Sequence, residues 1–258
     1  MVYEHSDVNE LLGTFFSLSE NIVYLRLPTT ILDLMTLDEL TAELKTIPSN
    51  DIKNGWSKKI TNGDDTFGLN FTTVQKIAKQ LETDAVLADE LYASHNHDLK
   101  VLGTYIDDGE SYTIDEMSDR IEQVYPSPFS DKFCENVVAK SPYAVHFIDV
   151  WKKSKDADKR CYAYSTLASV AKQKNTLGED FFIDHINAIS GCIKDEPRHV
   201  RKAMYKAMIN IGCRDNFLKE ASMAAARRVG LIRLNGNSSV DLLLKIQKAA
   251  ESRKPVFA

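Results

Sequence analysis

The sequence predicts an all-α fold, a solenoid built from repeated pairs of helices, and three observations support this prediction. Apolar residues recur at spacings of three and four along most of the chain, which is the period of one helix face. Strand patterns are almost absent, apart from a stretch rich in β-branched residues at 21–34 that we leave unassigned. One stretch of the later half resembles another 41 residues downstream, as a helical repeat would.

Individual helices are indicated by their N-terminal signals and by their apolar faces. In a capping box, a Ser or Thr side chain and an acidic side chain three residues later each bond the other's backbone amide. This pattern predicts helix starts at Thr36–Glu39, Thr113–Glu116 and Ser238–Asp241. Apolar residues lie on one face in the segments 70–82, 84–95, 158–173, 180–193, 197–212 and 216–230.

The internal repeat emerges when residues 160–171 are aligned with residues 201–212. The alignment pairs Arg160 with Arg201, Tyr164 with Tyr205, Leu167 with Met208 and Val170 with Ile211. A period near 40 residues is typical of HEAT-type helical pairs, which stack because one pair cannot bury its own apolar side. We therefore expect residues 36–258 to form a curved, C-shaped repeat domain with a concave groove. Residues 1–35 precede it as an extension that suits a capping helix.

Charge is distributed unevenly along the 258 residues, although the net charge is only −5. Residues 1–131 hold 9 Lys and Arg against 24 Asp and Glu, a net charge of −15, whereas residues 132–258 hold 23 against 13, a net charge of +10. A basic half points to a polyanionic partner such as nucleic acid, with solvated helix faces as the competing interpretation. The chain starts without a signal-peptide pattern and has no membrane-spanning run, so we expect a cytoplasmic monomer that does not bind a membrane.

Cysteine and histidine patterns do not favour a metal or a cofactor. The four cysteines stand singly, without a C-x-x-C pair, which is typical of reduced and buried thiols: Cys134, Cys161, Cys192 and Cys213. His95, His97 and Asp98 are close in sequence, but they fit a turn between two helices better than a metal site. We therefore expect no metal site and no cofactor.

Four segments, in this order and spacing, resemble one known family. They are FGLNFTTVQKIAKQL (67–81), DAVLADELYASHNHDLKVLGTYIDD (84–108), SDKFCENVVAKSPYA (130–144), and DEPRHVRKAMYKAMINIG with LKEASMAAARRVG (195–230). The chain resembles the AlkD-like DNA alkylation repair family from about residue 36 to residue 230. The resemblance implies HEAT-like repeats that hold duplex DNA with alkylated purines, and hydrolysis of the N-glycosidic bond of N3- or N7-alkylated purines.

The resemblance also implies the catalytic residues. The family's catalytic Asp matches Asp131, and an Arg of the next repeat matches Arg160. The family's Trp, four residues before the Asp, is Ser127 in this chain, and neither Trp56 nor Trp151 matches that position. A second departure follows Gly230, where the chain reads LIRLNGNSSVDLLLKIQKA instead of the Asp-His-Gly-type turn of many relatives.

Competing interpretations exist for these residues. Asp131 follows Ser127 and Pro128, a good cap and first residue, so it would also stabilise a helix dipole from the first turn. Arg160 could instead pair with Asp156 or Asp158 at the surface. Basic residues near successive helix ends form the predicted DNA-binding set: Lys159, Arg198, Arg201, Lys202, Lys206 and Arg214.

Three functions therefore remain open at the level of sequence. The first is an alkylpurine DNA glycosylase that uses Asp131 and Arg160. The second is a DNA-binding relative without excision activity, which the Ser127 position allows. The third is a HEAT-like scaffold for protein partners.

Overall fold

The computed structural model describes residues 36–47, 60, 63–125, 128–173, 176–235 and 238–252, all within one compact unit, Met35–Ala258. The unassigned stretch 21–34, the whole extension 1–35, Trp56 and Ser127 lie outside the described residues. The division of the chain at residue 35 stays a prediction.

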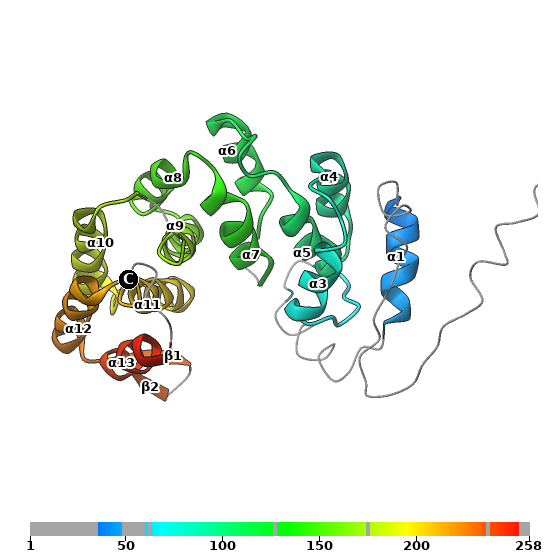
Figure 1. The fold of residues 1–258 in the computed structure, drawn as a ribbon. Helices are drawn as coiled ribbons and strands as arrows, with labels where there is room; N and C mark the ends of the chain where they lie inside the picture. The colour runs from blue at the N-terminus through cyan, green and yellow to red at the C-terminus, as the bar shows by residue number, and fades with distance from the viewer. Residues whose placement is uncertain are drawn as a thin grey trace, which may run out of the picture. The chain divides into compact units, whose positions relative to one another are not determined.

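The described residues are largely helical (Figure 1). In chain order the elements are α1 (Leu37–Thr46), α3 (Phe71–Ala78), α4 (Ala85–Ala93), α5 (His97–Ile106), α6 (Ile114–Glu122), α7 (Pro128–Asn136), the 3₁₀ helix η2 (Val138–Lys140), α8 (Ala144–Trp151), α9 (Ala157–Val170), α10 (Glu179–Cys192), α11 (Arg198–Ile211), α12 (Asn216–Val229), β1 (Leu231–Asn235), β2 (Ser238–Asp241) and α13 (Leu242–Ser252). The prediction of an all-α fold is confirmed.

Helices of successive pairs stack in order. Helices α3, α5, α7, α9, α11 and α13 each pack against the next, and we call this series the inner layer. Helices α4, α8, α10 and α12 each pack against a neighbouring helix of this series, and α10 also packs against α12. The residues of the inner layer are therefore the ones that successive repeats bring side by side.

Local signals explain where several helices begin. Both reciprocal bonds of the capping box are present at Thr36 and at Thr113, as predicted. The third predicted box is wrong, because Ser238–Asp241 forms β2, which pairs antiparallel with β1. The helix begins three residues later than expected, with Asp241 Oδ1 accepting from the amide of Leu244.

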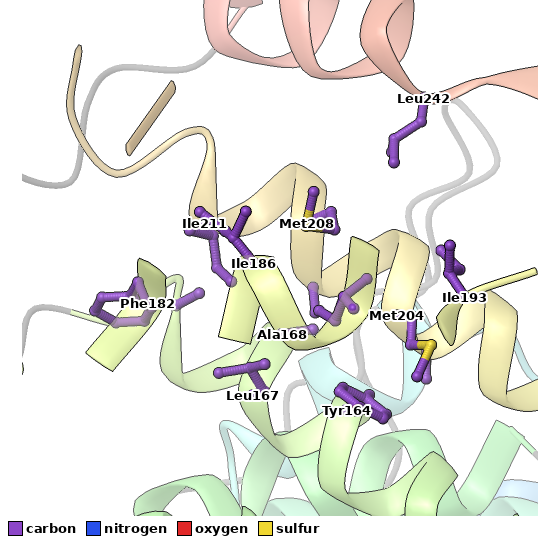
Figure 2. Packing of buried hydrophobic residues seen from close by; sticks show 14 of the residues in the cluster. Tyr164, Leu167, Ala168, Phe182, Ile186, Ile193, Met204, Met208, Ile211 and Leu242 are labelled. Atoms are coloured by element: carbon purple, nitrogen blue, oxygen red, sulfur yellow. The ribbon is translucent and has the colours of Figure 1, made fainter. Parts of the chain in front are cut away.

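The core of the later repeats contains several of the residues that the predicted repeat register aligns. Helices α9 and α11 have 14 residues each and pack more extensively than any other pair of elements in the described part of the chain. The aligned residues Leu167, Met208 and Ile211 are all fully buried in one cluster (Figure 2). Burying such a side chain stabilises the fold by about 1.5–3 kcal/mol. Of the described helices, none has the length and apolar character needed to cross a membrane.

Candidate nucleic-acid interface

Asp131 lies in the first turn of α7, on the inner layer. Pro128 is the first residue of that helix, as predicted, and Phe129 and Phe133 are buried beneath it. Asp131 itself is exposed, and its Oδ1 accepts a hydrogen bond of 2.9 Å from Ser165 Oγ on α9. Among the described residues, Oδ2 has no hydrogen-bond partner. One carboxylate oxygen is thus fixed, and the other is available to a ligand.

Two buried thiols are affected by the charges of both Asp131 and a lysine of α11, Lys206. Burial and the Asp131 carboxylate raise the pKa of Cys161 to about 12, whereas the Lys206 ammonium on α11 acts in the opposite direction. The same two charges act on Cys134, whose pKa burial also raises. Asp131 and Ser165 are in contact between α7 and α9, and Lys206 belongs to the next helix of the inner layer, α11. Both thiols stay protonated near neutral pH, so neither is a good nucleophile.

A second charged group, absent from the predicted set, lies one helical turn from Asp131. Glu135 is four residues further along α7, and its carboxylate accepts from Lys132 Nζ at 2.8 Å and from Lys172 Nζ, just after α9, at 3.1 Å. The i, i+4 spacing of Asp131 and Glu135, which makes them neighbours on the surface of a helix, could be read from the sequence. The ion pair with Lys172 joins residues 37 positions apart, and no local pattern indicates it.

Aromatic rings hold Lys132 from the other side. Its Nζ lies 5.0 Å from the ring centroid of Phe71 on α3 and 5.7 Å from that of Tyr105 on α5. Such contacts contribute about 0.5–2 kcal/mol, depending on their exposure to water. The charged group therefore bridges four successive helices of the inner layer, from α3 to α9.

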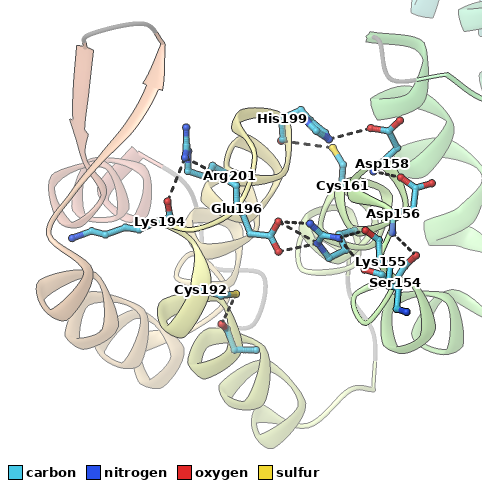
Figure 3. Close-up of polar contacts among 12 residues, drawn as sticks. Ser154, Lys155, Asp156, Asp158, Cys161, Cys192, Lys194, Glu196, His199 and Arg201 are labelled. Atoms are coloured by element: carbon cyan, nitrogen blue, oxygen red, sulfur yellow. Dashed lines mark hydrogen bonds and ion pairs between the residues drawn. The ribbon is translucent and has the colours of Figure 1, made fainter.

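Arg160 is engaged within the protein. Its Nε and Nη2 donate to the Glu196 carboxylate at 2.8–3.1 Å, and its Nη1 donates to the carbonyls of Ser154 and Lys155, each at 2.9 Å. Figure 3 shows the Glu196 carboxylate on one side of these contacts and Ser154 and Lys155 on the other. The structure does not support the surface pairing with Asp156 or Asp158, because the carboxylate partner is Glu196. A DNA phosphate that binds Arg160 would have to compete with its bidentate ion pair with Glu196.

Arg201, the repeat equivalent of Arg160, makes a similar contact. Its Nη1 donates to the carbonyl of Glu196 at 2.9 Å and to that of Lys194 at 3.4 Å, closing the turn before α11 as Arg160 closes the turn before α9 (Figure 3). The pairing of these two arginines in the predicted register thus reflects a shared structural role. Arg198 is exposed, and its Nε donates to the carbonyl of Leu234 on β1 at 2.8 Å.

The remaining residues of the predicted DNA-binding set differ in their surroundings. Lys159 forms an ion pair with Glu122 on α6, and Lys202 is exposed on α11. The prediction that Arg214 contacts DNA must be corrected, because this residue is only 1% exposed. Its Nη1 donates to the carbonyls of Ala171 at 2.9 Å and Gln173 at 3.1 Å, at the C-terminal end of α9. A side chain in this position offers no surface to a phosphate, so Arg214 belongs to the core.

The position of the missing Trp, Ser127, is outside the described residues, but the nearby aromatic residues are visible. Trp151 is 5% exposed and stacks on Phe147 with ring centroids 4.7 Å apart, so it is part of the core. Tyr125, two residues before Ser127, is partly exposed, and its hydroxyl donates to Asp64 Oδ2 at 2.8 Å.

Comparison with known proteins identifies the family. The model of the family described as DNA alkylation repair enzyme matches residues 40–227. The chain belongs to this family. The resemblance seen in the sequence is thus confirmed, over nearly the same residues. A comparison with curated proteins finds no match.

A solved structure supports the repeat architecture of this DNA alkylation repair family member. It is described as a new family of proteins related to the HEAT-like repeat DNA glycosylases with affinity for branched DNA structures, and it superposes with a TM-score of 0.77. The two sequences are 21% identical, and the match covers 86% of this chain and 97% of that chain. At this identity the likeness establishes the HEAT-like repeat fold of the chain.

Proposed function

We propose that the protein binds DNA through the inner layer around α7, α9 and α11 and removes N3- or N7-alkylated purines from it. The observation that carries the proposal is the arrangement of Asp131, which is exposed and fixed through one oxygen by Ser165. Membership of the DNA alkylation repair enzyme family makes a damaged purine in DNA the substrate to test.

The chemistry of such a substrate suits a single carboxylate. An N3- or N7-alkylated purine carries a positive charge, so it leaves readily and the positive charge of the transition state develops on the deoxyribose. Water forms a bond to C1′ while the bond from C1′ to the purine breaks, and the bonding electrons neutralise the departing base. The Asp131 carboxylate would stabilise the oxocarbenium-like sugar through Oδ2 and accept the proton of the attacking water. Lys206 would hold a neighbouring phosphate.

A second candidate function is DNA binding without excision. The state of Arg160 favours it, since the guanidinium that would steady the DNA backbone is occupied by Glu196. Loss of the family's Trp at Ser127 also favours it. The structural relative with affinity for branched DNA makes junctions a suitable ligand to compare with duplexes.

Release of free base from alkylated duplex DNA tests the proposal. We expect the wild-type protein to release N7-methylguanine or N3-methyladenine, and Asp131→Asn to slow the release by about 100-fold or more, because loss of one preorganised electrostatic group has effects of this size. The matched control is Asp115→Asn, which removes another first-turn carboxylate, on α6, and should leave the rate unchanged.

The other outcomes are also informative. If the wild type releases neither base but binds duplex or branched DNA, the second candidate function holds. If it neither releases a base nor binds DNA, both DNA functions fail and the protein scaffold remains.

A further inference from the structure

The two ammonium groups around Glu135 share a single carboxylate. Lys132 and Glu135 are three residues apart on α7, whereas Lys172 reaches the same carboxylate from the end of α9. Burial alone would raise the pKa of Glu135, but hydrogen bonds and the charges of the two lysines lower it to about 2. The carboxylate is therefore ionised at neutral pH, and the group carries a net charge of +1.

The two lysines are not held equally. The Lys132 side chain is 18% exposed and lies against Phe71 and Tyr105, while the Lys172 side chain is 40% exposed. Burial opposes the charge of Lys132, but Glu135 outweighs it and raises the pKa of Lys132. Lys132 is thus the fixed partner of Glu135, and Lys172 is the partner that can turn to an incoming anion.

The position of the group relates it to Asp131. Side chains four residues apart on a helix have Cβ atoms about 5–6 Å apart. Each DNA strand carries one phosphate per about 3.4 Å of helix axis. A strand whose sugar lies at Asp131 would therefore place a phosphate one or two nucleotides away beside Glu135.

We propose that Lys132, Glu135 and Lys172 form a phosphate site in which a DNA phosphate replaces Glu135 as the partner of Lys172. Glu135 orients the Lys172 ammonium in the free protein and competes with the phosphate for it. The bound phosphate sets the register of the strand relative to Asp131. This inference rests on the proposed DNA-binding function.

Substitutions of Glu135 and of Lys172 should change DNA affinity in opposite directions. Glu135→Gln keeps a hydrogen-bond acceptor for Lys132 but removes the competing charge, so DNA affinity should rise. Lys172→Ala removes one phosphate contact, so affinity should fall and the slope of log K against log salt concentration should become shallower by about 0.9. The loss of affinity between 50 and 200 mM salt should then be smaller by about 3.5-fold than in the wild type.

The control separates a specific effect from a general change in charge. Asp149→Asn removes the carboxylate of an equivalent i, i+3 ion pair with Lys152, at the end of α8 and outside the inner layer. It changes the net charge as Glu135→Gln does and should leave affinity at the wild-type value. Affinity for one duplex is measured by fluorescence anisotropy over a salt series, with a thermal melt of each variant to confirm folding.

Three results would overturn the inference. They are an unchanged or lower affinity of folded Glu135→Gln, an equal rise in Asp149→Asn, and an unchanged salt slope in Lys172→Ala. A wild type that binds neither duplex nor branched DNA would instead contradict the proposed function itself, so the two failures are distinguishable.

Discussion

Arg214→Met should lower the denaturant concentration at which the later repeats unfold. It should leave DNA affinity unchanged. Arg214 donates to two carbonyls at the end of α9 at 2.9 and 3.1 Å and to Val170 at a longer 3.5 Å, and its guanidinium lies 4.1 Å from the ring centroid of Phe182. A hydrogen bond from a charged donor contributes about 1.5–3 kcal/mol, and a shielded cation–π contact about 2 kcal/mol. Because such contributions are not additive, we expect a loss of about 3–5 kcal/mol in the free energy of unfolding.

Equilibrium unfolding in urea, followed by circular dichroism, measures this loss. The matched control is Arg228→Met, which changes an exposed arginine in the last turn of α12 and should alter the free energy by less than about 0.5 kcal/mol. A loss below 1 kcal/mol in Arg214→Met would refute the structural role. So would a lower DNA affinity in a protein of unchanged stability, because that result would return Arg214 to the DNA-binding set.

Two further predictions concern Arg160 and His185. Arg160→Gln should lower the free energy of unfolding by about 1–3 kcal/mol, because it leaves the Glu196 carboxylate, 13% exposed, without its partner; a variant of wild-type stability that no longer binds DNA would contradict this. Burial and then the charge of Lys152 lower the pKa of His185 to about 4 from its ordinary 6.5, so the unfolded chain binds a proton more readily than the folded one between these values. The contribution of neutral His185 to the free energy of unfolding should therefore be fully present above pH 6.5. It should fall by about 3 kcal/mol as the pH drops to 4. The pH profile of His185→Gln should lack this component, and equal profiles for variant and wild type would disprove it.

The fold was predictable where local signals and the global structure agree. The capping boxes at Thr36 and Thr113 and the apolar periodicity of α11 were sufficient to place those helices, whereas α9 is buried on all sides from Cys161 to Val170. The segment 238–241 was misassigned because Ser and Asp satisfy a helix cap and a strand end equally well. The Gly-Asn pair at 236–237, between the paired residues Asn235 and Ser238, is a hairpin signal that indicated the β1–β2 pairing and that the capping pattern obscured.

The candidate site was predictable only in part, since its chemistry depends on contacts between repeats. Asp131 came from the family resemblance, and its bond to Ser165 links residues 34 positions apart. Basic residues look alike in a sequence, yet Arg214 is buried against α9 while Lys202 is exposed on α11. Burial and ion pairing of this kind are set by the stacking of helices, which a single sequence does not specify.

Protection of lysines from chemical modification by bound DNA tests the location of the interface most directly. The protein is acetylated with and without a duplex, and the modified lysines are quantified by mass spectrometry. We expect DNA to protect Lys132 and Lys206, on the inner layer, and Lys172, just after α9, and to leave Lys153, after α8, and Lys219, on α12, as reactive as before. Protection of Lys153 and Lys219 without protection of Lys132, Lys172 and Lys206 would contradict the proposed location of the interface.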